Sequence, residues 1–74
     1  MPHIVIKMYP GRSGEIKENL ARKVAETVKE ELQIDASAIS VSVEEIPKED
    51  WKEQVYDKDI KDHANVYVKP GYEM

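Results

Sequence analysis

The feature that most constrains the fold is a long segment in which apolar residues recur at every fourth position. This segment runs from Gly14 to Leu32, and its other positions are mostly charged. A spacing of four predicts an amphipathic α-helix with a single apolar stripe, which packs against one surface. Ser13 is a candidate N-cap, and Glu15 lies in the first turn, where the helix dipole favours an anion. The stripe consists of Ile16, Leu20, Val24, Val28 and Leu32.

Two short β-rich runs flank the expected helix. Residues 4–8 end at the turn formers Pro10 and Gly11, and residues 39–44 alternate apolar and polar side chains. A strand, a long helix and a second strand form a βαβ unit, which implies parallel strands and a right-handed crossover. We expect the helix to cover the sheet face that carries Ile4, Ile6, Met8, Ile39, Val41 and Val43.

The C-terminal third predicts smaller elements. We expect a short helix over residues 48–56, with Pro47 near its start, and a short strand over residues 66–68, closed by a turn at Pro70 and Gly71. The opposite face of the sheet is polar and suits water or a light cover from this C-terminal segment. Its residues are His3, Lys7, Ser40, Ser42 and Glu44.

The length of 74 residues predicts a single domain over residues 1–74. Two strands and one helix do not make an adequate core, and so short a chain is marginal alone. We therefore expect a two-fold partner that extends the sheet to four strands with two helices on one face. The predicted fold class is α/β (α+β): a β-α-β unit with a short C-terminal helix and strand, completed by oligomerisation.

Composition excludes several classes of function. The chain has no cysteine, and its two histidines, His3 and His63, are isolated, so we expect no metal site. The net charge is −4 and the basic residues are dispersed, which argues against a nucleic-acid partner. No apolar run approaches the ~18 residues of a membrane span, and no signal peptide is evident. We expect a cytoplasmic protein.

The second residue is a candidate for chemistry. If Met1 is removed, Pro2 becomes a free N-terminus whose nitrogen is a secondary amine. Apolar burial or a nearby cation lowers the pKa of such an amine, and a general base poised near the working pH suits proton transfer from carbon. The alternative is a retained Met1 or an inert proline at a strand edge.

The order of these motifs resembles the 4-oxalocrotonate tautomerase family. An N-terminal proline on a strand, residues 10–20 opening a long helix and a second parallel strand carry the resemblance. Residues 49–51, Ile60 and the ending at residues 69–74 are similar to its longer-tailed PptA-like branch. The resemblance covers essentially the whole chain and implies an isomerase, a keto-enol tautomerase that needs no cofactor and uses Pro2 as the general base.

The resemblance also implies roles for two further residues. Arg12 matches an arginine that binds a substrate carboxylate, often across a subunit boundary, and a guanidinium suits that task because its fork pairs with two oxygens. Trp51 matches an aromatic residue that walls the pocket, where it would lower the pKa of Pro2 and could donate its N–H to a substrate carbonyl. The alternatives are a surface arginine and a tryptophan that only packs.

One position departs from the family pattern. Ser40 stands where short-tailed members carry a second arginine, so a dicarboxylate would lose one anchor. This favours a monocarboxylate with an aryl or apolar tail, such as the enol of phenylpyruvate, over 2-hydroxymuconate. His3 neighbours the proposed base, but strand alternation points it to the opposite face.

Three functions stay open from the sequence: a Pro2-dependent tautomerase, a non-catalytic dimeric binding or scaffold module with the same fold, and an enzyme with an unrelated substrate. Of the oligomeric states, we expect a dimer as in the longer-tailed branch, with a hexamer of the short-tailed kind as the alternative.

Overall fold

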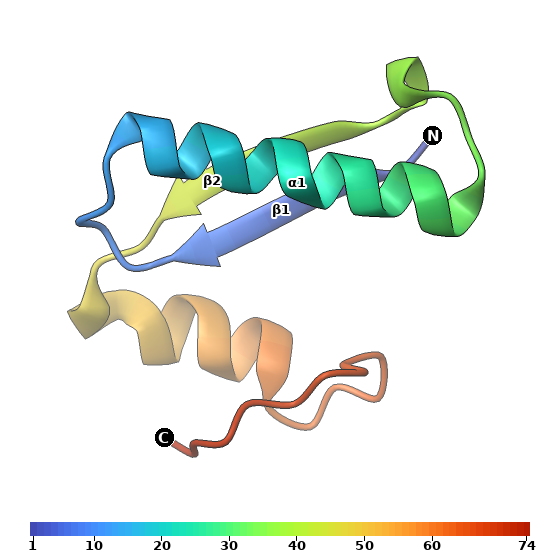
Figure 1. Cartoon of the computed structure of the whole chain (residues 1–74). Helices are drawn as coiled ribbons and strands as arrows, with labels where there is room; N and C mark the ends of the chain where they lie inside the picture. The colour runs from blue at the N-terminus through green and yellow to red at the C-terminus, as the bar shows by residue number, and fades with distance from the viewer.

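The computed structural model describes all 74 residues and contains the predicted βαβ unit (Figure 1). Strands β1 (His3–Met8) and β2 (Ser40–Glu45) run parallel, with His3 opposite Ser40 and Met8 opposite Glu45. Helix α1 (Gly14–Leu32) joins them and has the predicted bounds. The strands differ from the prediction by one residue at their ends.

Local hydrogen bonds explain where α1 begins and ends. The Ser13 hydroxyl accepts a hydrogen bond from the backbone N–H of Ile16, at an N–O distance of 3.2 Å, as an N-cap does. At the other end Gln33 adopts a left-handed conformation, with φ of 53°, and its N–H donates to the Lys29 carbonyl. The left-handed residue reverses the direction of the chain. A short 3₁₀ helix, η1 (Ala36–Ala38), then leads into β2.

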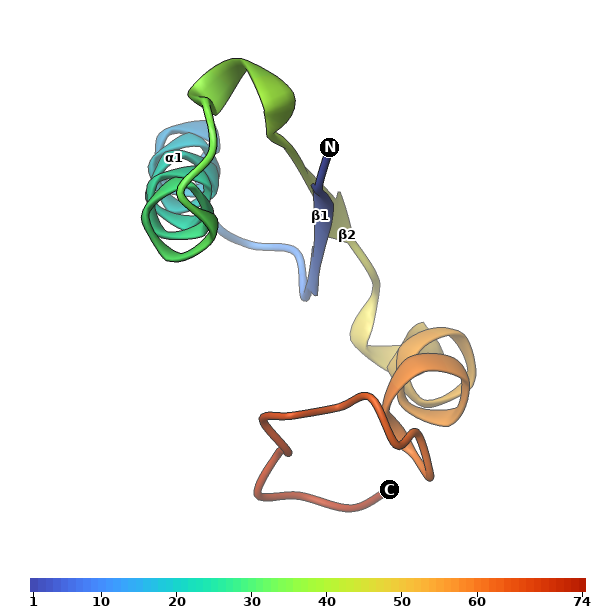
Figure 2. The same cartoon turned by 90° about the vertical axis from the view of Figure 1, so that its right-hand side faces the viewer.

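The C-terminal helix is longer and wider than the sequence predicts. A 3₁₀ turn, η2 (Lys48–Asp50), precedes a π-helix, η3 (Lys52–Ile60), where a helix over residues 48–56 was expected. A backbone hydrogen bond from the Lys61 N–H to the Tyr56 carbonyl, five residues earlier, closes the π-helix at 2.8 Å. Figure 2 shows α1 on one side of the sheet and η3 on the other. The C-terminal helix thus lies on the side opposite α1, where water or a light cover from the C-terminal segment was expected.

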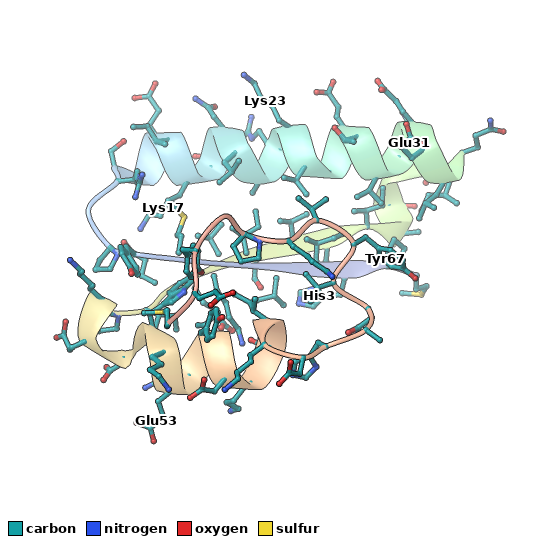
Figure 3. All side chains as sticks on the ribbon, turned by 90° about the horizontal axis from the view of Figure 1, so that it is seen from below. His3, Lys17, Lys23, Glu31, Glu53 and Tyr67 are labelled. Atoms are coloured by element: carbon teal, nitrogen blue, oxygen red, sulfur yellow. The ribbon has the colours of Figure 1, made fainter.

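The strand predicted over residues 66–68 is wrong. The segment is irregular, the Val66 N–H closes a turn on the His63 carbonyl, and the side chains of Tyr67 and Val68 are 92% and 90% exposed. A strand needs a neighbour to pair with its backbone groups, and neither β1 nor β2 pairs with this segment. Seen from below, the segment passes beneath the sheet, with Tyr67 toward the His3 end (Figure 3).

The chain alone buries very little. Only Val55 and Tyr56, on η3, are buried, and the stripe of α1 leaves Ile16 and Leu32 about half exposed. The accessible surface is 5949 Å², whereas a folded monomer of this mass is expected to expose about 4,700 Å². This excess fits a subunit whose core is completed by a partner. No helix is long and apolar enough to cross a membrane.

Candidate active site

The predicted site residues lie in two groups at opposite ends of β1. At the N-terminal end, the Pro2 carbonyl accepts a hydrogen bond from the Ser40 N–H at 3.2 Å. The Ser40 hydroxyl lies 2.7 Å from Nδ1 of His3, its neighbour across the two strands. The ring of Pro2 is half-buried, and Met1 is fully exposed. This end therefore brings Pro2 and Ser40 together.

At the C-terminal end of β1 lies a small cavity of about 330 Å³ that is wide open to solvent. It collects residues from the strand, from the loop before α1, from the start of the C-terminal helical region and from the tail. Two of the residues predicted from the sequence, Arg12 and Trp51, both line it. The complete lining is Lys7, Met8, Tyr9, Arg12, Trp51 and Tyr72.

Aromatic side chains build one wall of this cavity. Trp51 meets the ring of Tyr9 edge to face, with ring centroids 5.1 Å apart and an interplanar angle of 89°. Its indole N–H donates to the Tyr72 hydroxyl at 3.0 Å. The ring of Tyr72 in turn lies 5.8 Å, centroid to centroid, from that of buried Tyr56. The tail is therefore fastened to the helical region through the same aromatic residues that line the cavity.

Of the two basic residues in the cavity wall, only Arg12 is without an ion-pair partner. The Nζ of Lys7 lies 2.8 Å from Asp59 of η3, and this hydrogen bond raises the pKa of Lys7 above its ordinary value. The remaining ion pairs of the chain join Lys17 to Glu45, Arg22 to Glu18 and Lys52 to Asp57. The guanidinium of Arg12 is thus available to a carboxylate from outside the chain.

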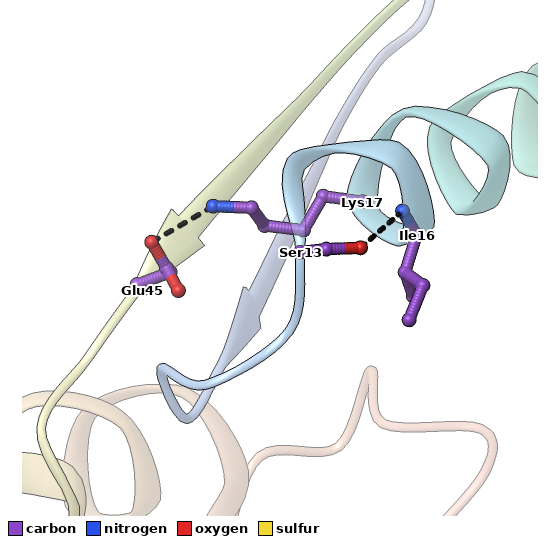
Figure 4. Close-up of polar contacts among 4 residues, drawn as sticks. All are labelled: Ser13, Ile16, Lys17 and Glu45. Carbon is purple, nitrogen blue, oxygen red and sulfur yellow. Dashed lines mark hydrogen bonds and ion pairs between the residues drawn. The ribbon is translucent and has the colours of Figure 1, made fainter.

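The loop that carries Arg12 is fixed on both sides. Gly11 has φ of +125°, a conformation that other residues rarely adopt, and Ser13 caps α1. One turn into the helix, the Nζ of Lys17 reaches Glu45 at the end of β2, at 2.9 Å (Figure 4). The hydrogen bond from Lys17 lowers the pKa of Glu45, so this pair is charged at neutral pH.

Within one chain the two groups do not meet. Six residues of β1 lie between Pro2 and Tyr9, so the two are about 23 Å apart along the strand. The structure therefore pairs Pro2 with Ser40 and Arg12 with Trp51, but it keeps the two pairs apart. It also shows that the Trp51 N–H, expected to be free for a substrate carbonyl, is bonded to Tyr72.

Sequence reasoning did not single out Tyr72 and Tyr9, which both line this cavity. The only signal for Tyr72 was its place directly after the Pro70-Gly71 turn, which can fold the tail back. A larger hollow of about 640 Å³ lies in the C-terminal segment and is lined by none of the residues predicted from the sequence as functional. No group of three or more possible metal-ligating side chains lies together.

Comparison with known proteins identifies the family. Residues 2–62 match the family model described as "Tautomerase enzyme". The chain is 45% identical to a "Probable tautomerase" of Xylella fastidiosa, over 97% of this chain and 89% of that protein. It is 37% identical to "Tautomerase PptA" of Enterobacter over the full length of both. It is also 41% identical to "2-hydroxymuconate tautomerase" of Bacillus subtilis, over 69% of this chain and 82% of that one.

Solved structures agree with this result. The crystal structure of YwhB, a homologue of 4-oxalocrotonate tautomerase, superposes with a TM-score of 0.61 at 42% identity, over 64% of this chain and 77% of the other. The chain belongs to the tautomerase family, as its sequence resemblance predicts, and it is therefore an isomerase. The alignment with PptA over the full length confirms the longer-tailed branch.

Proposed function

We propose that this protein is a cofactor-free keto-enol tautomerase of a small 2-oxo acid, with Pro2 as the general base after Met1 is removed. One observation carries the proposal: a cavity lined by aromatic rings contains an arginine with no partner in the chain, while the candidate base lies at the other end of the same strand. Two-fold pairing of subunits through β1 resolves this separation.

A two-fold axis between two subunits can bring the two ends of β1 together. The free edge of β1 can meet the same edge of a second copy, and a two-fold axis then makes the two strands antiparallel. Antiparallel pairing places the Pro2 end of one strand beside the Tyr9 end of the other. Each of the two sites would then combine Pro2 and Ser40 of one subunit with Arg12 and Trp51 of its partner.

In such a site the chemistry is a proton transfer within one bound molecule. Arg12 binds the substrate carboxylate, and the aromatic wall receives the tail. The Pro2 nitrogen takes the proton of the enol oxygen, the O–H electron pair forms the carbonyl, and the C=C electrons accept the proton back from Pro2 at the neighbouring carbon. The reaction has no net oxidation, and general acid-base catalysis of this kind contributes about 10²–10⁴-fold.

Charge favours a monocarboxylate as substrate. The cavity offers one unpaired guanidinium, and the second cation, Lys7, is held by Asp59. Ser40 adds no charge at the Pro2 end, and its hydroxyl lies within hydrogen-bonding distance of His3. A dicarboxylate would therefore place its second carboxylate without a cation, so the enol of phenylpyruvate is the better candidate and 2-hydroxymuconate the weaker one.

The proposal is tested by following ketonisation of both enols by ultraviolet absorbance. The protein is untagged, and removal of Met1 is confirmed by mass. We expect turnover that vanishes in Pro2→Ala while the fold survives, and a preference for phenylpyruvate enol. A retained N-terminal extension makes the Pro2 nitrogen an amide and should abolish turnover as well. Equal activity with an intact extension would contradict the mechanism, and binding without any turnover would favour the non-catalytic dimeric binding or scaffold module.

A further inference from the structure

We propose that Tyr72 is a specificity-determining residue that donates a hydrogen bond to the 2-oxo or enol oxygen of the substrate, and that Trp51 positions it. The inference rests on the proposed function and names the group that recognises the substrate oxygen. Tyr72 is the one tail residue in the wall of the cavity that contains Arg12. Its phenol is a neutral donor, which suits a carbonyl or enol oxygen.

The direction of the Tyr72 proton follows from its partner. An indole nitrogen only donates, so in the 3.0 Å contact with Trp51 the Tyr72 oxygen must be the acceptor. The phenol's own O–H therefore points away from Trp51. No other side chain or backbone group of the chain hydrogen-bonds to this hydroxyl, so the proton is available to a molecule in the cavity.

The Tyr72 ring is held in place before any ligand arrives. It packs against Tyr56, which is only 7% exposed, and Trp51 is itself fixed edge to face on Tyr9. When a hydrogen-bond donor is already held in place, less conformational entropy is lost on ligand binding. Arg12 and Tyr72 together present a charged fork and a neutral donor, which match a carboxylate and an adjacent 2-oxo oxygen.

The test separates recognition of that oxygen from packing by comparing two acids. Phenylpyruvate carries the 2-oxo group, and 3-phenylpropanoate has the same carboxylate and aryl tail without it. Calorimetry measures the affinity of each for wild type, Tyr72→Phe and Trp51→Phe. Tyr67→Phe is the matched control, because it removes a phenol hydroxyl from a tail residue that is 92% exposed and lies outside the cavity.

We expect Tyr72→Phe to lower the affinity for phenylpyruvate about three- to tenfold, the effect of one neutral hydrogen bond. Its affinity for 3-phenylpropanoate should be unchanged. Trp51→Phe should also reduce the preference for phenylpyruvate, because the Tyr72 hydroxyl then rotates freely, and Tyr67→Phe should match wild type. If Tyr72→Phe lowered the affinity for both acids equally, Tyr72 would only pack against the ligand, and the inference would be overturned. Unchanged affinity for both acids would overturn it as well.

The experiment is independent of proton transfer, so it distinguishes this inference from the proposed function. The same titrations are repeated in a Pro2→Ala background, where turnover is absent. Selective loss of phenylpyruvate affinity there supports Tyr72 even if Pro2 is not the base. If wild type binds neither acid, the inference is overturned, while Pro2-dependent chemistry on another substrate class stands.

Discussion

At the scale of single residues, Arg12 is the group on which substrate affinity should depend most directly. Its guanidinium has no partner in the chain, and it lines the aromatic cavity. We predict that Arg12→Gln raises KM for phenylpyruvate enol roughly ten- to hundredfold, the loss expected for hydrogen bonds to a charged group. Arg12→Lys should recover only part of this, because an ammonium lacks the planar fork.

The matched control for Arg12 is Arg22→Gln. Arg22 is exposed on α1 and pairs with Glu18 one turn earlier, so its loss should leave KM unchanged. The measurement is steady-state ketonisation followed by absorbance. If both arginine variants raised KM equally, the effect would reflect overall charge and not a carboxylate contact.

Gly11 offers a second prediction at this scale, because it sets the backbone next to Arg12. Its φ of +125° strains any residue with a Cβ, although the space around it is open. We predict that Gly11→Ala lowers the free energy of unfolding by about 1–3 kcal/mol. Gly14→Ala, also in open space but at the start of α1 without a positive φ, should be neutral or stabilising. The free energy of unfolding of both variants is measured by urea titration. Equal losses in the two variants would contradict the argument from the positive φ of Gly11.

Some site residues could be predicted from sequence and others could not. Pro2, Arg12 and Trp51 were singled out by residue type together with a family resemblance, and the structure places Arg12 and Trp51 in one cavity. The contact between Trp51 and Tyr72 spans 21 residues. It depends on how an irregular tail folds back, and no periodic pattern encodes that path.

At the scale of elements, the start of α1 connects the fold to the site. The Ser13 cap and the ion pair between Lys17 and Glu45 hold the first turn next to the loop that carries Arg12. We predict that Ser13→Ala lowers the free energy of unfolding by about 1 kcal/mol and raises KM modestly, because the loop loosens. Thr27→Ala, in the middle of the helix, removes a hydroxyl that bonds only to the Lys23 carbonyl and should cost nothing.

The readout for the Ser13 prediction is chemical denaturation, with KM measured on the same samples. A loss of stability without any change in KM would show that the cap supports α1 but does not position Arg12. If Ser13→Ala lowered the free energy of unfolding no more than Thr27→Ala does, the Ser13 hydroxyl would not stabilise α1 as an N-cap.

The elements differ in how far sequence could predict them. Helix α1 has a period, a cap residue and a charged face, and its bounds were predicted correctly. The register of β1 against β2 keeps both alternating patterns aligned, so the parallel pair was predictable as well. Residues 66–68 have the composition of a strand, but strand formation needs a neighbouring edge, and composition cannot supply one.

At the scale of the whole molecule, the exposed apolar surface calls for a partner. The radius of gyration is 13.8 Å, against about 11 Å for a typical domain of this length. The surface in excess of that of an ordinary monomer is about 1,250 Å², which is more than the ~800 Å² per partner of a standard interface. The need for a partner was predictable from the small number of elements. The number of subunits depends on surface details that the sequence pattern does not specify.

The proposed sharing of each site between two subunits leads to a prediction that only a mixture of two variants can test. At a substrate concentration well below KM, Pro2→Ala subunits are expected to be inactive alone, and Arg12→Gln subunits should keep no more than about a tenth of wild-type activity, as their raised KM implies. In a mixed dimer, one of the two sites would receive its Pro2 from the Arg12→Gln subunit and its Arg12 from the Pro2→Ala subunit, and would be intact. Random association of equal amounts should therefore restore about a quarter of wild-type activity, because one site in four combines the two functional residues.

The complementation is measured by mixing the two variants in denaturant, refolding them together and assaying ketonisation. Each variant refolded alone and wild type taken through the same steps are the controls. Recovery near a quarter would establish that Pro2 and Arg12 of one site come from different subunits, as the proposed pairing through β1 requires, since the two residues lie at opposite ends of that strand. If the mixture stayed as inactive as its components, Pro2 and Arg12 would have to act from the same subunit. In that case the loop that carries Arg12 would have to move toward the Pro2 end of β1.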